Sequence, residues 1–267
     1  MRSVLTLILL VLCLLVTPAR AAAEDGGMFS TVTLSAKATY ASKYIWRGYD
    51  IWNDNPAFQP DVSLDFNGLY AGIWSSYSTA QGCADPFGDV CSSWDEHDYY
   101  GGIYGALWDG SPGSVEYDIS YTYFQFFRLE GVDTHEILLN VTHPALLKGL
   151  AETPPVLYWG FAYGKPVNET SPVSQWVKAG LKMPFSLFDI GGTALAEAFW
   201  DDGAGSFGAP AGVSHIKTGV FFELKTASFS IKPSLFYQQA QKNTDPSSLL
   251  DSEFWFELQL GYSMPVK

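Results

Sequence analysis

Apolar and polar residues alternate with a period of two through almost the whole 267-residue chain. From Thr31 to Trp46 the even positions are mostly apolar or aromatic, and the odd positions are mostly polar. Side chains of a β-strand point alternately to opposite faces, so this period predicts strands with one apolar and one polar face. Helical periodicity is nearly absent, and the sequence therefore predicts an all-β fold.

The alternation predicts about twelve strands. The first two are Thr31–Trp46 and Phe58–Phe66, and Asn67-Gly68 then gives the strongest two-residue hairpin signal before a third strand that begins at Leu69. The later strands are expected near residues 96–108, 115–127, 134–143, 155–164, 175–185, 190–201, 214–224, 227–238 and 253–264.

The links between these strands alternate in length. Short turns follow the second, fourth, eighth and tenth strands, whereas longer polar or Gly/Pro-rich links follow the first, third, seventh, ninth and eleventh. Barrels of bacterial outer membranes have short turns at the periplasmic end and long loops outside. The links therefore favour an antiparallel up-and-down barrel, and a secreted β-sandwich is the alternative.

Charged side chains lie on the polar faces of the strands, and the apolar faces carry almost none. A membrane barrel turns its apolar face to lipid, and twelve strands leave a lumen wide enough for water and charged groups. Aromatic residues near strand ends, such as Tyr44, Trp46 and Phe58, are expected at the membrane interfaces. We predict a transmembrane barrel at residues 31–264 whose lumen contains Lys37, Lys43, Asp61, Asp65, Glu116, Asp118, Lys178, Lys182, Lys217, Lys232 and Glu257.

These lumen charges are unevenly distributed. Asp61 and Asp65 lie on the second strand and Lys178 and Lys182 on the eighth, and strands six apart are opposite in a closed barrel of twelve. We expect acidic and basic walls to face each other, with a weak preference for cations because acids outnumber bases. The alternative is pairing between neighbouring strands, with Lys43 neutralising Asp61.

The first 23 residues have the layout of a secretory signal peptide. A positive residue precedes an apolar run over residues 4–16, and small residues follow it. About 13 apolar residues are too few for a helix that spans a bilayer. We expect cleavage after Ala21 or Ala23 and a short lead at residues 24–30; an uncleaved anchor helix is the alternative.

The formal net charge is −13, from 28 acidic and 15 basic residues. Nucleic-acid phosphates are held by clusters of Lys and Arg, and this chain has none. The composition therefore argues against a nucleic-acid partner.

Two cysteines remain after the predicted cleavage. Cys83 and Cys91 flank a loop-type sequence, and an even pair in an exported chain predicts a disulfide, here in an extracellular loop. Two unrelated thiols are the alternative. Asp95 and His97 lie nearby, but the spacing matches no zinc site, so we predict neither a metal nor a cofactor.

The sequence gives little support to an enzymatic function. None of the four histidines, His97, His135, His143 and His215, is accompanied by a serine in a Gly-x-Ser-x-Gly frame. His135 falls on the lipid-facing parity near the outer end of its strand, which keeps an outer-membrane lipase as an alternative. We predict a protein that is not an enzyme.

Arg47 ends the predicted first strand. One interpretation makes it an anion contact at the mouth of the barrel. The preferred interpretation packs it on Trp46 or Trp52 and pairs it with Asp50 or Asp54.

The segments Ala41–Gly48, Pro56–Gln59 and Gly68–Trp74 resemble the TorF-type porin family, a poorly characterised family of bacterial outer-membrane proteins. The resemblance covers roughly residues 38–76 and extends more weakly to about residue 125. It implies an outer-membrane barrel that can form a pore, and it implies no substrate and no catalytic residue. The cysteine loop and the non-aromatic C-terminus depart from the usual family members.

The sequence thus predicts a porin-like barrel in the bacterial outer membrane, embedded in lipid, through which small polar solutes or ions pass passively. A non-conducting structural or interaction barrel with partner-binding loops is the first alternative, and the lipase is the second. The solute, the oligomeric state and the openness of the lumen are left open by the sequence.

Overall fold

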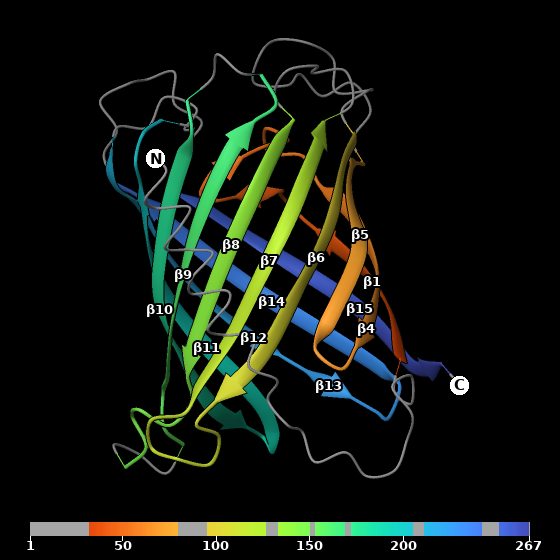
Figure 1. Ribbon diagram of the computed structural model, residues 1–267, viewed down its shortest axis with the longest axis vertical. Helices are drawn as coiled ribbons and strands as arrows, with labels where there is room; N and C mark the ends of the chain where they lie inside the picture. The colour runs from red at the N-terminus through yellow and green to blue at the C-terminus, as the bar shows by residue number, and fades with distance from the viewer. Residues whose placement is uncertain are drawn as a thin grey trace.

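Twelve long antiparallel strands close into a single barrel (Figure 1). The structure is a computed structural model that describes residues 32–79, 95–126, 133–149, 153–168, 172–204, 211–241 and 251–266. Within these ranges no helix is long and apolar enough to cross a membrane. The predicted all-β barrel of about twelve strands is confirmed.

The wall of the barrel follows the order of the chain. Its strands are β1 (Val32–Ala41), β4 (Ala57–Phe66), β5 (Leu69–Ser78), β6 (Asp95–Leu107), β7 (Val115–Phe126), β8 (Thr134–His143), β9 (Val156–Pro166), β10 (Ser174–Leu187), β11 (Ile190–Asp201), β12 (Gly212–Phe222), β14 (Phe229–Ala240) and β15 (Glu253–Val266). Three two-residue strands are β2 (Ile45–Trp46), β3 (Tyr49–Asp50) and β13 (Leu224–Lys225).

Closure of the barrel depends on the pairing of its first and last strands. β1 pairs with β15 from Val32↔Val266 to Ala41↔Glu257, and on its other side with β4. β12 pairs with β14, which completes the ring. Each long strand therefore has a hydrogen-bonded neighbour on both sides, and the wall has no free edge.

Asn67-Gly68 forms the predicted hairpin between β4 and β5. Both residues have positive φ, 52° and 89°, as a type I′ turn requires. Cβ on Gly68 would come within 2.7 Å of the Tyr104 carbonyl oxygen, so glycine is needed there for space as well as for φ.

The predicted first strand, Thr31–Trp46, is too long. β1 ends at Ala41, and residues 42–56 leave the wall as the β2–β3 hairpin and the turn after it. Arg47 and Gly48 connect β2 to β3 with φ of 50° and 93°, again a type I′ pair. The prediction that Tyr44 and Trp46 lie at a membrane interface is therefore wrong, because both belong to the segment that leaves the wall. The alternation of apolar and polar residues continues past Ala41 because the strands of the inward β2–β3 hairpin have the same two-residue period.

Contacts that skip a strand identify the inner face of the wall. Tyr100 on β6 donates a hydrogen bond to Asp61 on β4 (2.6 Å), and Tyr70 on β5 donates one to Asp118 on β7 (2.7 Å). Side chains reach over an intervening strand on the concave side of a sheet, so these residues point inward. On the opposite parity, large apolar side chains are exposed, among them Val62, Leu64, Ile73, Leu235 and Phe256.

Glycines on the inner face make room for these tyrosines. Tyr70 lies against its cross-strand partner Gly102, and Tyr100 lies against its partner Gly72. Cβ on Gly102 would come within 2.6 Å of the Tyr70 hydroxyl, and Cβ on Gly72 within 2.4 Å of the Tyr100 hydroxyl. Each ring can therefore cross the neighbouring strand and reach a carboxylate beyond it.

We predict that Gly102→Val weakens the barrel by about 1–3 kcal/mol, because the added side chain displaces Tyr70 and costs the Asp118 hydrogen bond. The measurement is the urea midpoint of folding in detergent or lipid. Gly191→Val is the matched control. Gly191 is also a strand residue, but a Cβ added there would meet no other atom within 4 Å. Equal urea midpoints for the two variants would show that Gly102 is not needed to make room for Tyr70.

Candidate functional site

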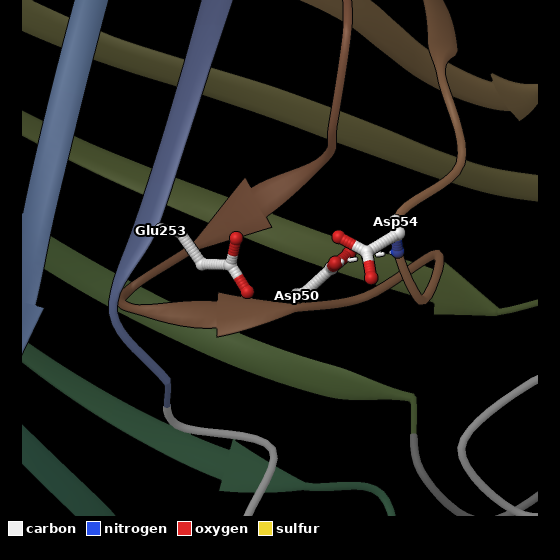
Figure 2. Close-up of side chains that lie close together, drawn as sticks. All are labelled: Asp50, Asp54 and Glu253. Carbon is white, nitrogen blue, oxygen red and sulfur yellow. Dashed lines mark hydrogen bonds between the residues drawn. The ribbon is translucent and has the colours of Figure 1, made fainter.

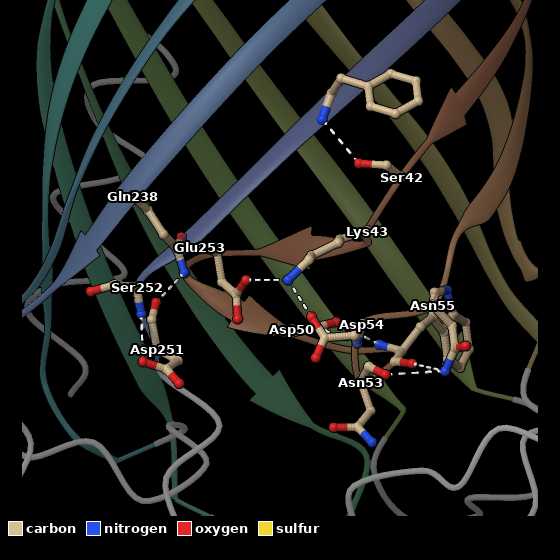
Figure 3. A network of polar contacts seen from close by, with 12 residues as sticks. Ser42, Lys43, Asp50, Asn53, Asp54, Asn55, Gln238, Asp251, Ser252 and Glu253 are labelled. Atoms are coloured by element: carbon tan, nitrogen blue, oxygen red, sulfur yellow. Dashed lines mark hydrogen bonds and ion pairs between the residues drawn. The ribbon is translucent and has the colours of Figure 1, made fainter.

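Residues 42–56, here called the inner segment, fold into the barrel from the end of β1 (Figure 3). Three hydrogen bonds attach it to three different parts of the wall. Tyr44 donates to Glu96 on β6 (2.8 Å), the Trp52 indole donates to Ser76 on β5 (3.2 Å), and the Gly48 carbonyl accepts from Gln238 on β14 (2.5 Å). The segment therefore crosses the interior and narrows it.

Aromatic packing holds the inner segment in place. Tyr49 and Trp52 are among the most buried side chains, with 2% and 1% exposed. Tyr44 packs between the Trp52 and Trp74 rings at 6.0 and 5.7 Å between centroids. Burial of large rings is a strong and directional contribution to packing, so this segment is a fixed part of the interior.

Arg47, at the tip of the β2–β3 hairpin, reaches the far wall. Its guanidinium lies 4.2 Å from the Trp46 ring and 4.3 Å from the ring of Trp176 on β10. It forms an ion pair with Glu136 on β8, whose side chain is 4% exposed. Packing on Trp46 was predicted, but the predicted acidic partners, Asp50 and Asp54, are wrong. The true partner is 89 positions away in the sequence, beyond any local spacing pattern.

Three buried carboxylates surround this arginine. Glu96 and Asp98 lie on β6 and Glu136 lies on β8, with β7 between them; their side chains are 2%, 8% and 4% exposed, and all point inward. Asp98 Oδ1 makes no hydrogen bond within the described residues. Buried charges are costly unless they are paired, so the Arg47 guanidinium is the main compensation for this acidic cluster.

A second acidic group lies at the base of the inner segment. Asp50, Asp54 and Glu253 place one carboxylate oxygen each within 4.8 Å of one another (Figure 2). The Lys43 ammonium pairs with Asp54 and, at 2.5 Å, with Glu253 (Figure 3). Asp50 accepts the backbone N–H groups of Trp52 and Asp54 at 3.2 and 2.6 Å.

The Lys43 ammonium therefore supplies the positive charge at this trio. Burial alone would lower the pKa of Lys43, but its hydrogen bonds to Asp54 and Glu253 raise it above the usual value. Burial raises the pKa of Asp50 to about 6. Asp61 is paired with the neighbouring strand, as the alternative expected, but its partner is Lys37 on β1 at 3.1 Å and not Lys43.

Most of the remaining interior charges form an acidic wall and a basic wall on different sides of the barrel, with Lys37 on β1 beside the acidic wall and Glu197 on β11 within the basic wall. β4 and β10 are six strands apart around the ring of twelve. The acidic wall carries Asp61 and Asp65 on β4 and Glu116 and Asp118 on β7, and the basic wall carries Lys178 and Lys182 on β10, Lys217 on β12 and Lys232 on β14. Glu257 on β15 accepts a hydrogen bond from the Trp255 indole at 3.0 Å.

A cavity of about 480 Å³ lies beside the acidic wall, on the side of the short turns. That volume falls in the range of small-molecule sites. It is lined in part by Tyr104, Glu116, Asp118, Asn140 and Thr142.

One serine–histidine pair lies on the outer face. Ser75 Oγ is 2.7 Å from His97 Nδ1 on the neighbouring strand, and Ser75 is 6% exposed. Sequence reasoning missed this pair because 22 residues separate its members. His135, singled out from the sequence, is 2.7 Å from the Tyr121 hydroxyl instead.

Several predictions fall on residues outside the described ranges. These are the Cys83–Cys91 disulfide, the signal peptide at residues 1–23 and the lead at residues 24–30. They stay predictions.

Comparison with solved structures shows the barrel fold. The chain is similar to a KdgM porin with a TM-score of 0.51 and 7% identity, covering 86% of this chain and 99% of that one. It is also similar to an outer membrane channel from Pseudomonas putida F1, with a TM-score of 0.49, 11% identity and coverage of 91% and 100%. A search of curated proteins gives no match.

A family model, described as a bacterial protein of unknown function (Gcw_chp), matches residues 25–194. This match does not carry the TorF-type name, which stays a prediction. Since the model matches more than half of the sequence, the chain belongs to the Gcw_chp family of bacterial proteins.

Proposed function

We propose that this protein is an outer-membrane channel that gives small polar solutes passive passage, with the inner segment as its constriction. The observation that carries the proposal is the inner segment itself, a hairpin fixed across the interior between β6, β8 and β14. The charged inner face and the apolar outer face support placement in a lipid bilayer. Porin-like barrel architecture supports the same assignment.

A non-conducting barrel whose loops bind a partner is the main competitor. Conductance separates the two proposals, because a closed interior carries no current. We expect the purified barrel to give discrete single-channel steps in planar bilayers. Absence of steps from folded, heat-modifiable protein would refute the channel.

Removal of the constriction should enlarge the channel. We predict that replacing residues 45–50 with a short Gly/Ser link raises single-channel conductance, because the wall does not depend on β2 and β3 for pairing. Shortening the Asp109–Ser114 turn outside the interior is the control and should leave conductance unchanged. Equal conductance of the hairpin deletion and the wild type would exclude the inner segment as the constriction.

The Arg47–Glu136 pair should hold the hairpin in place. We predict that Arg47→Met loosens the inner segment by about 3 kcal/mol, because Glu136 is left buried without its cation. Hydrogen–deuterium exchange of residues 42–56 should rise. The double variant Arg47→Met/Glu136→Gln should recover part of the protection from exchange. An unchanged exchange rate in the single variant would show that the Arg47–Glu136 pair does not hold the hairpin.

Two serine–histidine contacts bear on the enzyme alternative: Ser75–His97 on the outer face and the buried contact between the adjacent residues Ser214 and His215. Ser75 is almost covered, and its hydroxyl would need exposure to attack an ester. We therefore expect no labelling of the folded barrel by a fluorophosphonate probe. Labelling that disappears in Ser75→Ala would establish a hydrolase and overturn this expectation.

A further inference from the structure

The basic wall contains more positive charge than its carboxylates balance. Lys217 pairs with Glu197 on β11 at 3.0 Å. Neither Lys178 nor Lys182 has a carboxylate within 4.0 Å among the described residues. Three ammonium groups therefore share one carboxylate. Lys232 also has no carboxylate within 4.0 Å in the described part of the chain, but it lies on β14, three strands from β10.

Aromatic rings fix the two unpaired lysines without neutralising them. Lys178 Nζ lies 5.8 Å from the centre of the Trp176 ring, and Lys182 Nζ lies 4.9 Å from that of Tyr158. Cation–π contacts position an ammonium group but leave its full charge available to a ligand. Gly160 makes room for this arrangement, since a Cβ there would come within 2.8 Å of Lys178 Cε.

These lysines lie on the route past the constriction. Trp176, which packs against the Arg47 guanidinium, is two residues before Lys178 on the same face of β10. Lys182 follows four residues later, about 13 Å further along the strand. A solute that passes the inner segment on this side therefore meets Lys178 first and Lys182 next.

We propose that Lys178, Lys182 and Lys217 form a binding subsite for small organic carboxylates inside the barrel. The ammonium groups attract and hydrogen-bond a carboxylate, and the rings of Trp176 and Tyr158 contact its carbon skeleton. The inference rests on the proposed channel function, to which it adds a solute class. Weak overall cation preference is compatible with it, because cations have the acidic wall opposite.

The test is inhibition of open-channel chloride current by succinate in planar bilayers. We expect the half-inhibiting concentration to rise about tenfold in Lys178→Gln/Lys182→Gln, the lower end of the effect of focused charge in a channel. The charge-retaining variant Lys178→Arg/Lys182→Arg should stay close to the wild type. Neutral succinamide should inhibit neither protein. Unchanged succinate inhibition in the double glutamine variant would overturn the subsite.

Lys148→Gln is the matched control for charge removal, because Lys148 is an exposed lysine in the turn between β8 and β9 and belongs to no strand of the wall. An equal loss of inhibition in this control would show a bulk charge effect and also overturn the subsite. Calorimetric titration of the detergent-solubilised barrel with succinate separates the two proposals. A barrel that binds succinate through these lysines but carries no current would refute the channel alone.

Discussion

Closure of the wall between β1 and β15 is the constraint on which the rest of the structure depends. A closed ring has an inside, so the period-two alternation sorts every strand residue to the interior or to the outer surface. The inner face can then collect carboxylates, lysines and tyrosine hydroxyls from strands that are distant in sequence. Tyr100 and Tyr70 bond to Asp61 and Asp118 only because curvature brings alternate strands within reach across a glycine.

Periodicity and turn chemistry were sufficient to predict the wall. The alternation is local, and Asn67-Gly68 specifies its own turn, so both can be recognised without knowledge of the fold. The inner segment could not be found in this way. Tyr44 and Trp46 keep the parity of β1, and an inward hairpin with period two has the same pattern as a longer strand. The available signal in the sequence was Gly48, because glycine adopts positive φ readily and so favours a tight turn at this point.

The interior charges divide into those that sequence can place and those that it cannot. The parity of Asp61, Lys178 or Lys182 follows from alternation, and their strands' positions on opposite sides follow from counting strands around the ring. The partner of Arg47 cannot be predicted from the sequence, because the pairing with Glu136 depends on where the hairpin tip meets the far wall. Lys43 shows the same limit, since its pairing with Glu253 depends on the β1–β15 closure.

In the proposed channel, the inner segment and the basic wall act at successive depths of one passage. Trp176 connects them, because one ring contacts the Arg47 guanidinium and lies beside Lys178. Arg47 is balanced by Glu136, so its charge serves to hold the hairpin, whereas Lys178 and Lys182 have no carboxylate partner within the described ranges. This division has a consequence for the proposed channel and its proposed subsite: the ion pair holds the constriction in place, and the ammonium groups beyond it select the solutes that are retained.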